Sequence, residues 1–382
     1  MSTRSADRLA DSRPTRARID LAALAGNWAI ARRHAGARAV IAVVKADAYG
    51  HGVSAVAGRL QREGCTAFAV ATASEVAALR AAGVDAPVLL LGGVHDAADA
   101  RTALALAATP VLHHEAMRTA VEDAAASLGR RAPVHVEVDT GMRRLGVPVG
   151  EAAALIARVA ASRHLALAGV STHFARADER DPAPTRAQAQ ALAVVLENLR
   201  RRGVDPGQVH LANSAGLLGT ASWHDLLPGD AVRPGVMLYG AAPAPHFAGA
   251  GLRPVMTLQT AVTALRRVAE GEGVGYGAVW RAPRSGWVAT LPIGYADGVP
   301  WSLGRPNAGG TVLLAGRPRA IVGRISMDLA TVWLEDDAVA LGEQAIVFGA
   351  GAPVEALAAA AETIAYELLV RVGDRVPRMA ID

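Results

Sequence analysis

The sequence has 382 residues, of which 52% are hydrophobic and 19% are charged, so it encodes a globular protein with enough residues for two domains. Its 39 basic and 35 acidic residues leave a net charge of +4, which is too small over this length to favour a nucleic-acid partner. No apolar run reaches the length of a membrane span, and the single cysteine, Cys65, excludes an internal disulfide. We therefore expect a cytoplasmic protein with no membrane partner and no bound metal.

The chain begins with a polar stretch and then becomes periodic. Residues 1–15 lack the apolar segment of a secretory signal, which predicts a disordered tail. Helical spacing follows over 19–33, with Asp20 as a plausible N-cap. After residue 39, short apolar runs alternate with alanine-rich segments of helical length. The expected strands are 39–44, 67–71, 88–91, 110–112, 134–138, 165–171, 209–212 and 232–238. The expected helices are 53–62, 74–82, 97–107, 115–127, 152–161 and 185–202.

This rhythm of strand and helix predicts a (β/α)8 barrel over residues 16–250, an α/β fold. A doubly wound open sheet is the alternative, but its glycine fingerprint is missing. Residues 240–251 form a linker rich in Ala, Pro and Gly. Beyond the linker, short strands between glycine and proline turns predict a mainly β domain over 251–382, with one helix at 353–369. Its expected strands are 256–265, 287–291, 311–314, 319–322, 330–333 and 344–348.

The first barrel strand ends at Lys45, which is followed by a glycine-punctuated turn. Strand ends in such barrels meet at the mouth where the chemistry takes place. Burial lowers the pKa of an amine, which favours attack on a carbonyl and formation of a Schiff base. A lysine that extends into solvent is the alternative. The Tyr49 hydroxyl and the His51 imidazole beside it favour an active-site loop.

Polar residues also occupy the later strand ends. Ser214 follows the seventh strand, and Gly235 and Val236 lie on the eighth. Barrels often bind phosphate after these two strands. An ordinary N-cap by Asn213 or Ser214 is the alternative. Arg233 lies in an apolar strand, and a buried arginine cannot release its proton. Against a pyridine nitrogen it would donate a hydrogen bond without protonating the ring, and a structural salt bridge is the other interpretation.

The motif A-V-V-K-A-D-A-Y-G-H-G at 42–52 resembles the cofactor-lysine motif of the alanine racemases. These are pyridoxal 5'-phosphate (PLP) enzymes with a (β/α)8 barrel and a C-terminal β domain. Further motifs follow in family order over nearly the whole chain beyond residue 15, at 138–142, 172–175, 212–216, 233–235, 294–298 and 324–328. The implied reaction interconverts L-alanine and D-alanine, and its implied role is D-alanine supply for bacterial peptidoglycan.

The resemblance implies a site shared between the subunits of a homodimer. Lys45 would bind PLP and act as the base on one face of alanine, and Tyr276 of the partner subunit would be the base on the other. A proton must leave one face and return to the other, so two bases are the minimum. The remaining implied cofactor ligands are Tyr49, Arg144, His173, Ser214, Arg233, Gly235, Val236 and Tyr366.

These ligands have distinct implied roles. Tyr49, Ser214, Gly235, Val236 and Tyr366 would hold the phosphate. His173 would orient Tyr276, and His210 would support Arg233 against the pyridine nitrogen. Arg144 would contact the cofactor's phenolic oxygen and the substrate carboxylate, with help from Met327. Tyr295 and Asp328 would line the entrance.

One position departs from the family pattern. Glu137 stands where many members have a lysine carbamylated by carbon dioxide, so we expect activity that is independent of bicarbonate. Three alternatives remain open: a serine or broad-specificity racemase, a fold-related PLP decarboxylase, and a non-catalytic PLP-binding barrel. The decarboxylase would leave Tyr276 without a role, and the non-catalytic barrel would lack the second domain.

Overall fold

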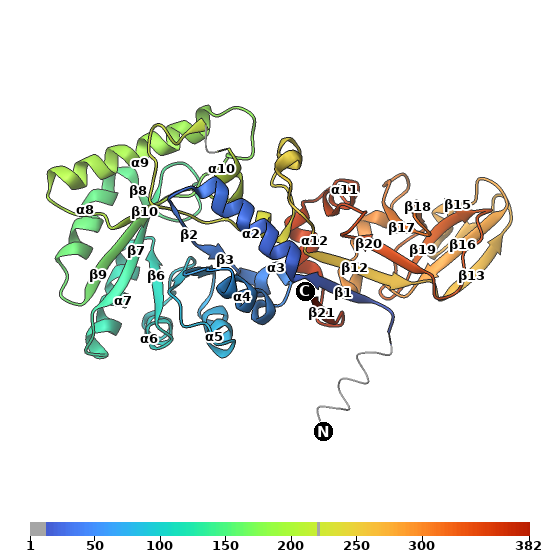
Figure 1. Ribbon diagram of the computed structural model, residues 1–382, viewed down its shortest axis with the longest axis horizontal. Helices are drawn as coiled ribbons and strands as arrows, with labels where there is room; N and C mark the ends of the chain where they lie inside the picture. The colour runs from blue at the N-terminus through green and yellow to red at the C-terminus, as the bar shows by residue number, and fades with distance from the viewer. Residues whose placement is uncertain (1–12, 220–221) are drawn as a thin grey trace, which may run out of the picture.

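The computed structural model describes residues 13–219 and 222–382, which form two domains side by side (Figure 1). The predicted polar tail falls outside the described residues except for 13–15, where Arg13 and Thr15 are hydrogen-bonded to the C-terminal domain. In the part of the chain that the structure describes, no helix is long and apolar enough to cross a membrane.

The first domain is a parallel barrel, as predicted. Its strands pair in the order of the chain, and the last strand pairs with the first, which closes the ring. The first strand is interrupted at Ile41, so that one half pairs with the last strand and the other half with the second. The strand segments are β2 (Ala39–Val40), β3 (Ala42–Val43), β4 (Phe68–Val70), β5 (Val88–Leu90), β6 (Ala108–Leu112), β7 (Ala132–Asp139), β9 (Leu165–Ser171), β10 (Gln208–His210) and β11 (Ala231–Val232), with β8 (Val147–Pro148) beside β7.

Side-chain caps start several of the barrel helices. Asp20 accepts the N–H of Ala23 at the start of α2, which confirms the predicted cap. Thr72 and Glu75 form a complete capping box on α5. The helices are α2 (Leu21–Ala35), α4 (Val53–Arg62), α5 (Ala73–Ala81), α6 (Ala97–Ala105), α7 (Glu115–Ser127), α8 (Val149–Ala161), α9 (Ala183–Arg201) and α10 (Ser214–Leu218). The helices alternate with the strands, so the C-terminal ends of all the strands lie at the same mouth of the barrel.

The second domain is built on a mainly antiparallel sheet. Its strand order is β13-β16-β19-β18-β17-β20-β12-β1-β21. The strands are β1 (Arg16–Asp20), β12 (Met256–Ala261), β13 (Ala264–Val268), β16 (Gly286–Leu291), β17 (Thr311–Leu314), β18 (Arg317–Val322), β19 (Ala330–Glu335), β20 (Gln344–Phe348) and β21 (Arg378–Ile381). A separate ribbon pairs β14 (Gly273–Val274) with β15 (Trp280–Arg281).

Three elements differ from the prediction. The strand expected at 256–265 is two strands, β12 and β13, that lie far apart in the sheet order. The helix expected at 353–369 is α11 (Val354–Ala360) and α12 (Ala365–Arg371), because the chain turns at Glu362 with a positive φ of 57°. Residues 16–20 were predicted as part of the barrel domain, but β1 pairs with β12 and β21.

The position of β1 has a simple cause. Ala17 and Ile19 are buried while Arg18 between them is exposed, which is the alternation of a strand with one buried face. The N-terminal strand therefore completes the sheet of the C-terminal domain, and the barrel domain begins with α2.

Candidate active site

Lys45 follows β3 at the mouth of the barrel and opens a left-handed turn. The turn, labelled α3 (Lys45–Gly50) in Figure 1, holds Ala46, Asp47, Ala48 and Tyr49 at φ values from 52° to 55°. A left-handed conformation costs an L-residue about 1–2 kcal/mol. Four such residues in a row require support from neighbouring groups, and strain of this kind concentrates at functional sites.

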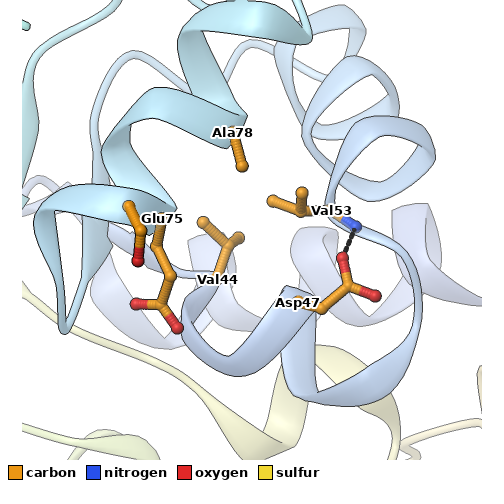
Figure 2. A pocket seen from close by; sticks show the side chains of 6 residues that line it. Val44, Asp47, Val53, Glu75 and Ala78 are labelled. Atoms are coloured by element: carbon orange, nitrogen blue, oxygen red, sulfur yellow. Dashed lines mark hydrogen bonds between the residues drawn. The ribbon is translucent and has the colours of Figure 1, made fainter. Parts of the chain in front are cut away.

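Two carboxylates supply that support (Figure 2). Glu75 accepts the N–H of Ala46 through Oε1 at 2.6 Å and the N–H of Ala71 through Oε2 at 2.7 Å. Asp47 accepts the N–H of Val53 through Oδ1 at 2.7 Å. The first residue of the left-handed run is thereby tied to α5, and the second is tied to α4, so the direction in which Lys45 leaves the strand is fixed.

The Lys45 amine has an environment suited to nucleophilic and base chemistry. Its pKa is lowered, first by burial and then by the charge of Arg144, while Glu75 opposes the shift. A larger neutral fraction makes the amine a better nucleophile and base near neutral pH. Lys45 is also the only lysine in the 382-residue sequence, so no other lysine amine can form a Schiff base.

Arg233 lies in the barrel interior and is held from several sides. Its Nη2 donates to the carbonyl of Thr172 at 2.7 Å, and its Nη1 donates to the carbonyl of His210 at 3.0 Å and to the Nδ1 of the same residue. The His210 Nε2 is 2.7 Å from the Nδ1 of His135. Burial and the Arg233 charge lower the pKa of His135 to about 4 and that of His210 well below its usual value. The imidazoles stay neutral, and the guanidinium keeps its charge because burial lowers its pKa only to about 10.

A cluster of hydroxyls and backbone N–H groups lies beyond the ends of β10 and β11. The Ser214 Oγ accepts the N–H of Gly235 at 2.9 Å, and a Cβ built on Gly235 would lie 2.3 Å from the Tyr49 hydroxyl. The Tyr49 and Tyr366 ring centroids are 6.3 Å apart. Burial raises the pKa of both phenols, that of Tyr366 to about 12, so both remain O–H donors. Asn213 provides the N-cap of α10, which leaves the Ser214 hydroxyl for this cluster.

His173 connects these groups. Its Nδ1 lies 3.4 Å from Nη2 of Arg233, and its Nε2 lies 3.5 Å from Nδ2 of Asn213. Burial lowers its pKa to about 3, with further contributions from the charges of Arg233, Arg144 and Lys45. The imidazole is therefore neutral, and its surroundings put the predicted Lys45, Arg144 and Arg233 near one another.

Glu137 is half-buried on β7, near enough to Arg233 to oppose the lowering of the arginine pKa by burial. In the described ranges no ion pair joins Glu137 to Arg144. The neighbouring Arg143 instead pairs with Asp139 at 3.4 Å.

The remaining predicted residues lie in the C-terminal domain and are open to solvent. Tyr276 in η4 (Tyr276–Ala278) is 71% exposed, Met327 52% and Tyr295 in η5 (Tyr295–Asp297) 45%. Figure 1 shows β15, which follows η4, at the end of the domain far from α3 and α10. Within one chain the fold therefore does not bring Tyr276 to Lys45.

Comparison with known proteins finds one family model for each of the two domains. The alanine racemase N-terminal domain model matches residues 19–243, and the C-terminal domain model matches residues 255–380. This chain belongs to the alanine racemase family. Its relatives include an alanine racemase of Geobacter sulfurreducens, 39% identical over 97% of this chain and 98% of the relative. A catabolic alanine racemase of Pseudomonas aeruginosa is 42% identical over 96% of this chain and 99% of the relative.

Solved structures agree with the family assignment. The crystal structure of alanine racemase from Streptomyces lavendulae has a TM-score of 0.90 and 35% identity, and covers 97% of both chains. The biosynthetic alanine racemase of P. aeruginosa has a TM-score of 0.87 and 38% identity, and covers 97% of this chain and 100% of that chain. As a member of the alanine racemase family, the protein is an isomerase of the amino-acid racemase class.

Several residues of this racemase site were not predicted from the sequence. Glu75 had a usable signal, because Thr72 and Glu75 have the spacing of a capping box. Tyr239 had none: its ring stacks on Tyr49 at 4.6 Å and its hydroxyl donates to the carbonyl of Val43 at 2.9 Å. His135, which supports His210, likewise lies within an otherwise ordinary strand.

Proposed function

We propose that this protein interconverts L-alanine and D-alanine with pyridoxal 5'-phosphate bound through Lys45. The observation that carries the proposal is the sole lysine of the chain, which lies on a strained turn with a lowered pKa and near Arg144 and Arg233. When bound, the cofactor withdraws electrons from the substrate α-carbon, which makes its proton acidic.

The residues at the mouth fit this cofactor. Arg233 is fixed as a charged donor and would bind the pyridine nitrogen without protonating it. The hydroxyls of Tyr49, Ser214 and Tyr366 and the backbone of Gly235 and Val236 would hold the phosphate. The absence of a side chain at Gly235 supports this assignment, because a Cβ there would clash with the Tyr49 hydroxyl.

The proposed mechanism uses two bases on opposite faces of the α-carbon. Lys45 removes or returns the proton on one face, and Tyr276 of the partner subunit does so on the other. His173, neutral at physiological pH and with its Nδ1 facing the Arg233 donor, would donate a hydrogen bond from Nε2 to the oxygen of that tyrosine and orient it. Arg144 would hold the substrate carboxylate, with help from the backbone of Met327 of the partner subunit. The high exposure of Tyr276 and Met327 in one chain supports a homodimer in which a second copy covers them.

The test is complementation between two inactive variants. Homodimers of Lys45→Ala lack one base, and homodimers of Tyr276→Phe lack the other. A mixed dimer has one intact site, so random mixing is expected to restore about a quarter of the activity of the unmodified dimer. No recovery after mixing would refute the shared site.

Heavy water separates the two proton transfers. Unmodified protein should convert L-alanine to D-alanine with deuterium at the α-carbon, and Lys45→Ala should abolish this. Tyr276→Phe should still exchange the α-proton on the Lys45 face without inverting it. Exchange that is lost together with inversion in Tyr276→Phe would contradict the proposed roles.

We further propose that the product D-alanine serves peptidoglycan synthesis in the cytoplasm. Alanine is the substrate in the names of the relatives, both biosynthetic and catabolic. Rates with L-serine relative to L-alanine test the substrate, and growth that requires added D-alanine after deletion of the gene tests the role.

A further inference from the structure

A buried carboxylate lies beneath the predicted entrance residues of the C-terminal domain. The Asp297 side chain is 0% exposed and is bound by both terminal nitrogens of Arg13, Nη1 to Oδ1 at 2.9 Å and Nη2 to Oδ2 at 2.7 Å. Its Oδ2 also accepts the N–H of Gly294 at 3.0 Å. A buried carboxylate is stable only when charges and donors of this kind compensate it.

The interaction extends to the surface through a second arginine. Arg375 Nε lies 3.4 Å from Oδ1 of Asp297, and Arg375 Nη2 donates to Oδ1 of Asp328 at 2.7 Å. Arg13, Asp297, Arg375 and Asp328 thus form an alternating series, which we call the charge chain. The charge chain connects the buried Asp297 to the exposed Asp328 through shared partners.

The charge chain holds two loops as one body, the entrance unit of residues 294–298 and 326–328. The N–H of Tyr295 donates to the carbonyl of Ser326 and the N–H of Ala296 to the carbonyl of Met327, both at 3.1 Å. A Cβ on Gly294 would lie 2.3 Å and 2.4 Å from these same two carbonyl oxygens. The loops are therefore packed backbone to backbone, and the unit carries Tyr295, Met327 and Asp328.

Arg13 itself is anchored independently of the entrance unit. Its Nη2 donates to the carbonyl of Pro292 at 2.7 Å. Two residues later, Thr15 Oγ1 donates to the same carbonyl at 2.7 Å and lies 2.8 Å from Oγ1 of Thr260. The segment before β1 thus holds Arg13 in place at the end of β16.

We propose that Arg13 is a positioning residue which, through Asp297, holds the entrance unit in the shape required by the active site of the partner subunit. This inference rests on the proposed function, in which Met327 serves the partner's site, and on the predicted place of Tyr295 and Asp328 at the entrance. Without Arg13, the nearest cation to Asp297 is Arg375, and a closer Arg375–Asp297 contact withdraws Arg375 from Asp328. The entrance unit then shifts, while Lys45 and Tyr276 keep their places.

The expected signature is a change in KM with little change in kcat. Arg13→Ala should raise the KM for L-alanine about five- to tenfold and change kcat less than about twofold, since small misplacements of binding groups have effects of this size. The KM of Arg13→Lys should lie between those of the unmodified protein and Arg13→Ala, because lysine keeps the charge and loses the bidentate geometry. A purely structural role would lower the melting temperature and leave KM unchanged.

Mixed dimers, purified through two different affinity tags, show which subunit the residue serves. In the first, a Lys45→Ala subunit pairs with an Arg13→Ala subunit, so the working Lys45 faces an intact entrance unit and KM should be normal. In the second, a Lys45→Ala/Arg13→Ala subunit pairs with an unmodified subunit, so the working Lys45 faces the altered unit and KM should be raised.

Equal KM values in the two mixed dimers overturn this inference. If Arg13→Ala does not fold, Arg13→Lys in the same two dimers provides the comparison. Failure of the Lys45→Ala and Tyr276→Phe subunits to complement each other would instead refute the proposed function. Complementation together with equal KM values refutes only the role of Arg13.

Discussion

Four histidines with strongly lowered pKa values predict a steep loss of stability in mild acid. Burial is the main cause in each case: it lowers the pKa of His51 and His135 to about 4, that of His173 to about 3, and that of His210 well below the usual 6.5. The Arg233 charge adds to the shift at the last three. All four imidazoles are neutral in the folded protein above about pH 5, whereas in the unfolded chain they titrate near 6.5.

The sign and size of the effect follow from proton linkage. A lowered pKa in the folded state gives stability that is complete above pH 6.5 and is lost as the pH falls toward 4, because only the unfolded chain takes up the protons. Four such groups make the free energy of unfolding fall by roughly 5 kcal/mol per pH unit between about pH 6 and pH 4. Typical stabilities are about 5–15 kcal/mol, so we expect acid unfolding to begin near pH 5.

Denaturant titrations at pH values between about 7 and 5 measure this slope. His51→Gln should reduce it by about a quarter, because it removes one of the four groups while an amide can still donate to the carbonyl of Tyr49, 2.8 Å from His51 Nδ1. The exposed His95 provides the matched control, and the slope of His51→Gln is compared with that of His95→Gln. A free energy of unfolding that stays constant over this range would refute the reasoning.

Three further predictions concern the site. Bicarbonate should not stimulate the purified protein, because Glu137 supplies a carboxylate directly and Lys45 is the only lysine available for carbamylation; stimulation on its addition would argue against this. Gly235→Ala should weaken PLP binding at least about tenfold in an absorbance titration, because the added Cβ would clash with the Tyr49 hydroxyl. Unchanged affinity would disprove the proposed phosphate site. Glu75→Gln should lower the pKa of Lys45 further, because the Glu75 charge opposes the existing shift. Labelling of this single amine in the apoprotein measures the pKa, and a rise would contradict the assignment.

Much of the fold was predictable because the barrel repeats one local pattern. Short buried strands and capped helices recur in order, and the prediction of Val53–Arg62 and Glu115–Ser127 matches α4 and α7. The short strands β14, β15 and β21 were missed, because runs of two to four residues are too short to show a periodic signal. Arg16–Asp20 was assigned to the wrong domain because its pairing partners, β12 and β21, lie far away in the sequence.

The site was predictable to the extent that barrel strands bring their ends together. Lys45, His173 and Arg233 follow from that rule. The left-handed turn after Lys45 does not, because Ala and Tyr have no preference for positive φ and the turn depends on contacts with Glu75 and Asp47. The sequence places Tyr276 in a loop, but it does not show whether that loop reaches the site of its own subunit or that of the partner.

The location of β1 sets the order in which the protein can be assembled during synthesis. The ribosome makes β1 before the barrel, while both of its pairing neighbours, β12 and β21, are made after it. The barrel can fold as soon as it emerges, but β1 must wait with two unpaired edges, the condition under which strands associate wrongly. A fragment that carries the barrel alone should therefore begin at Asp20, which keeps the cap of α2 and omits the waiting strand.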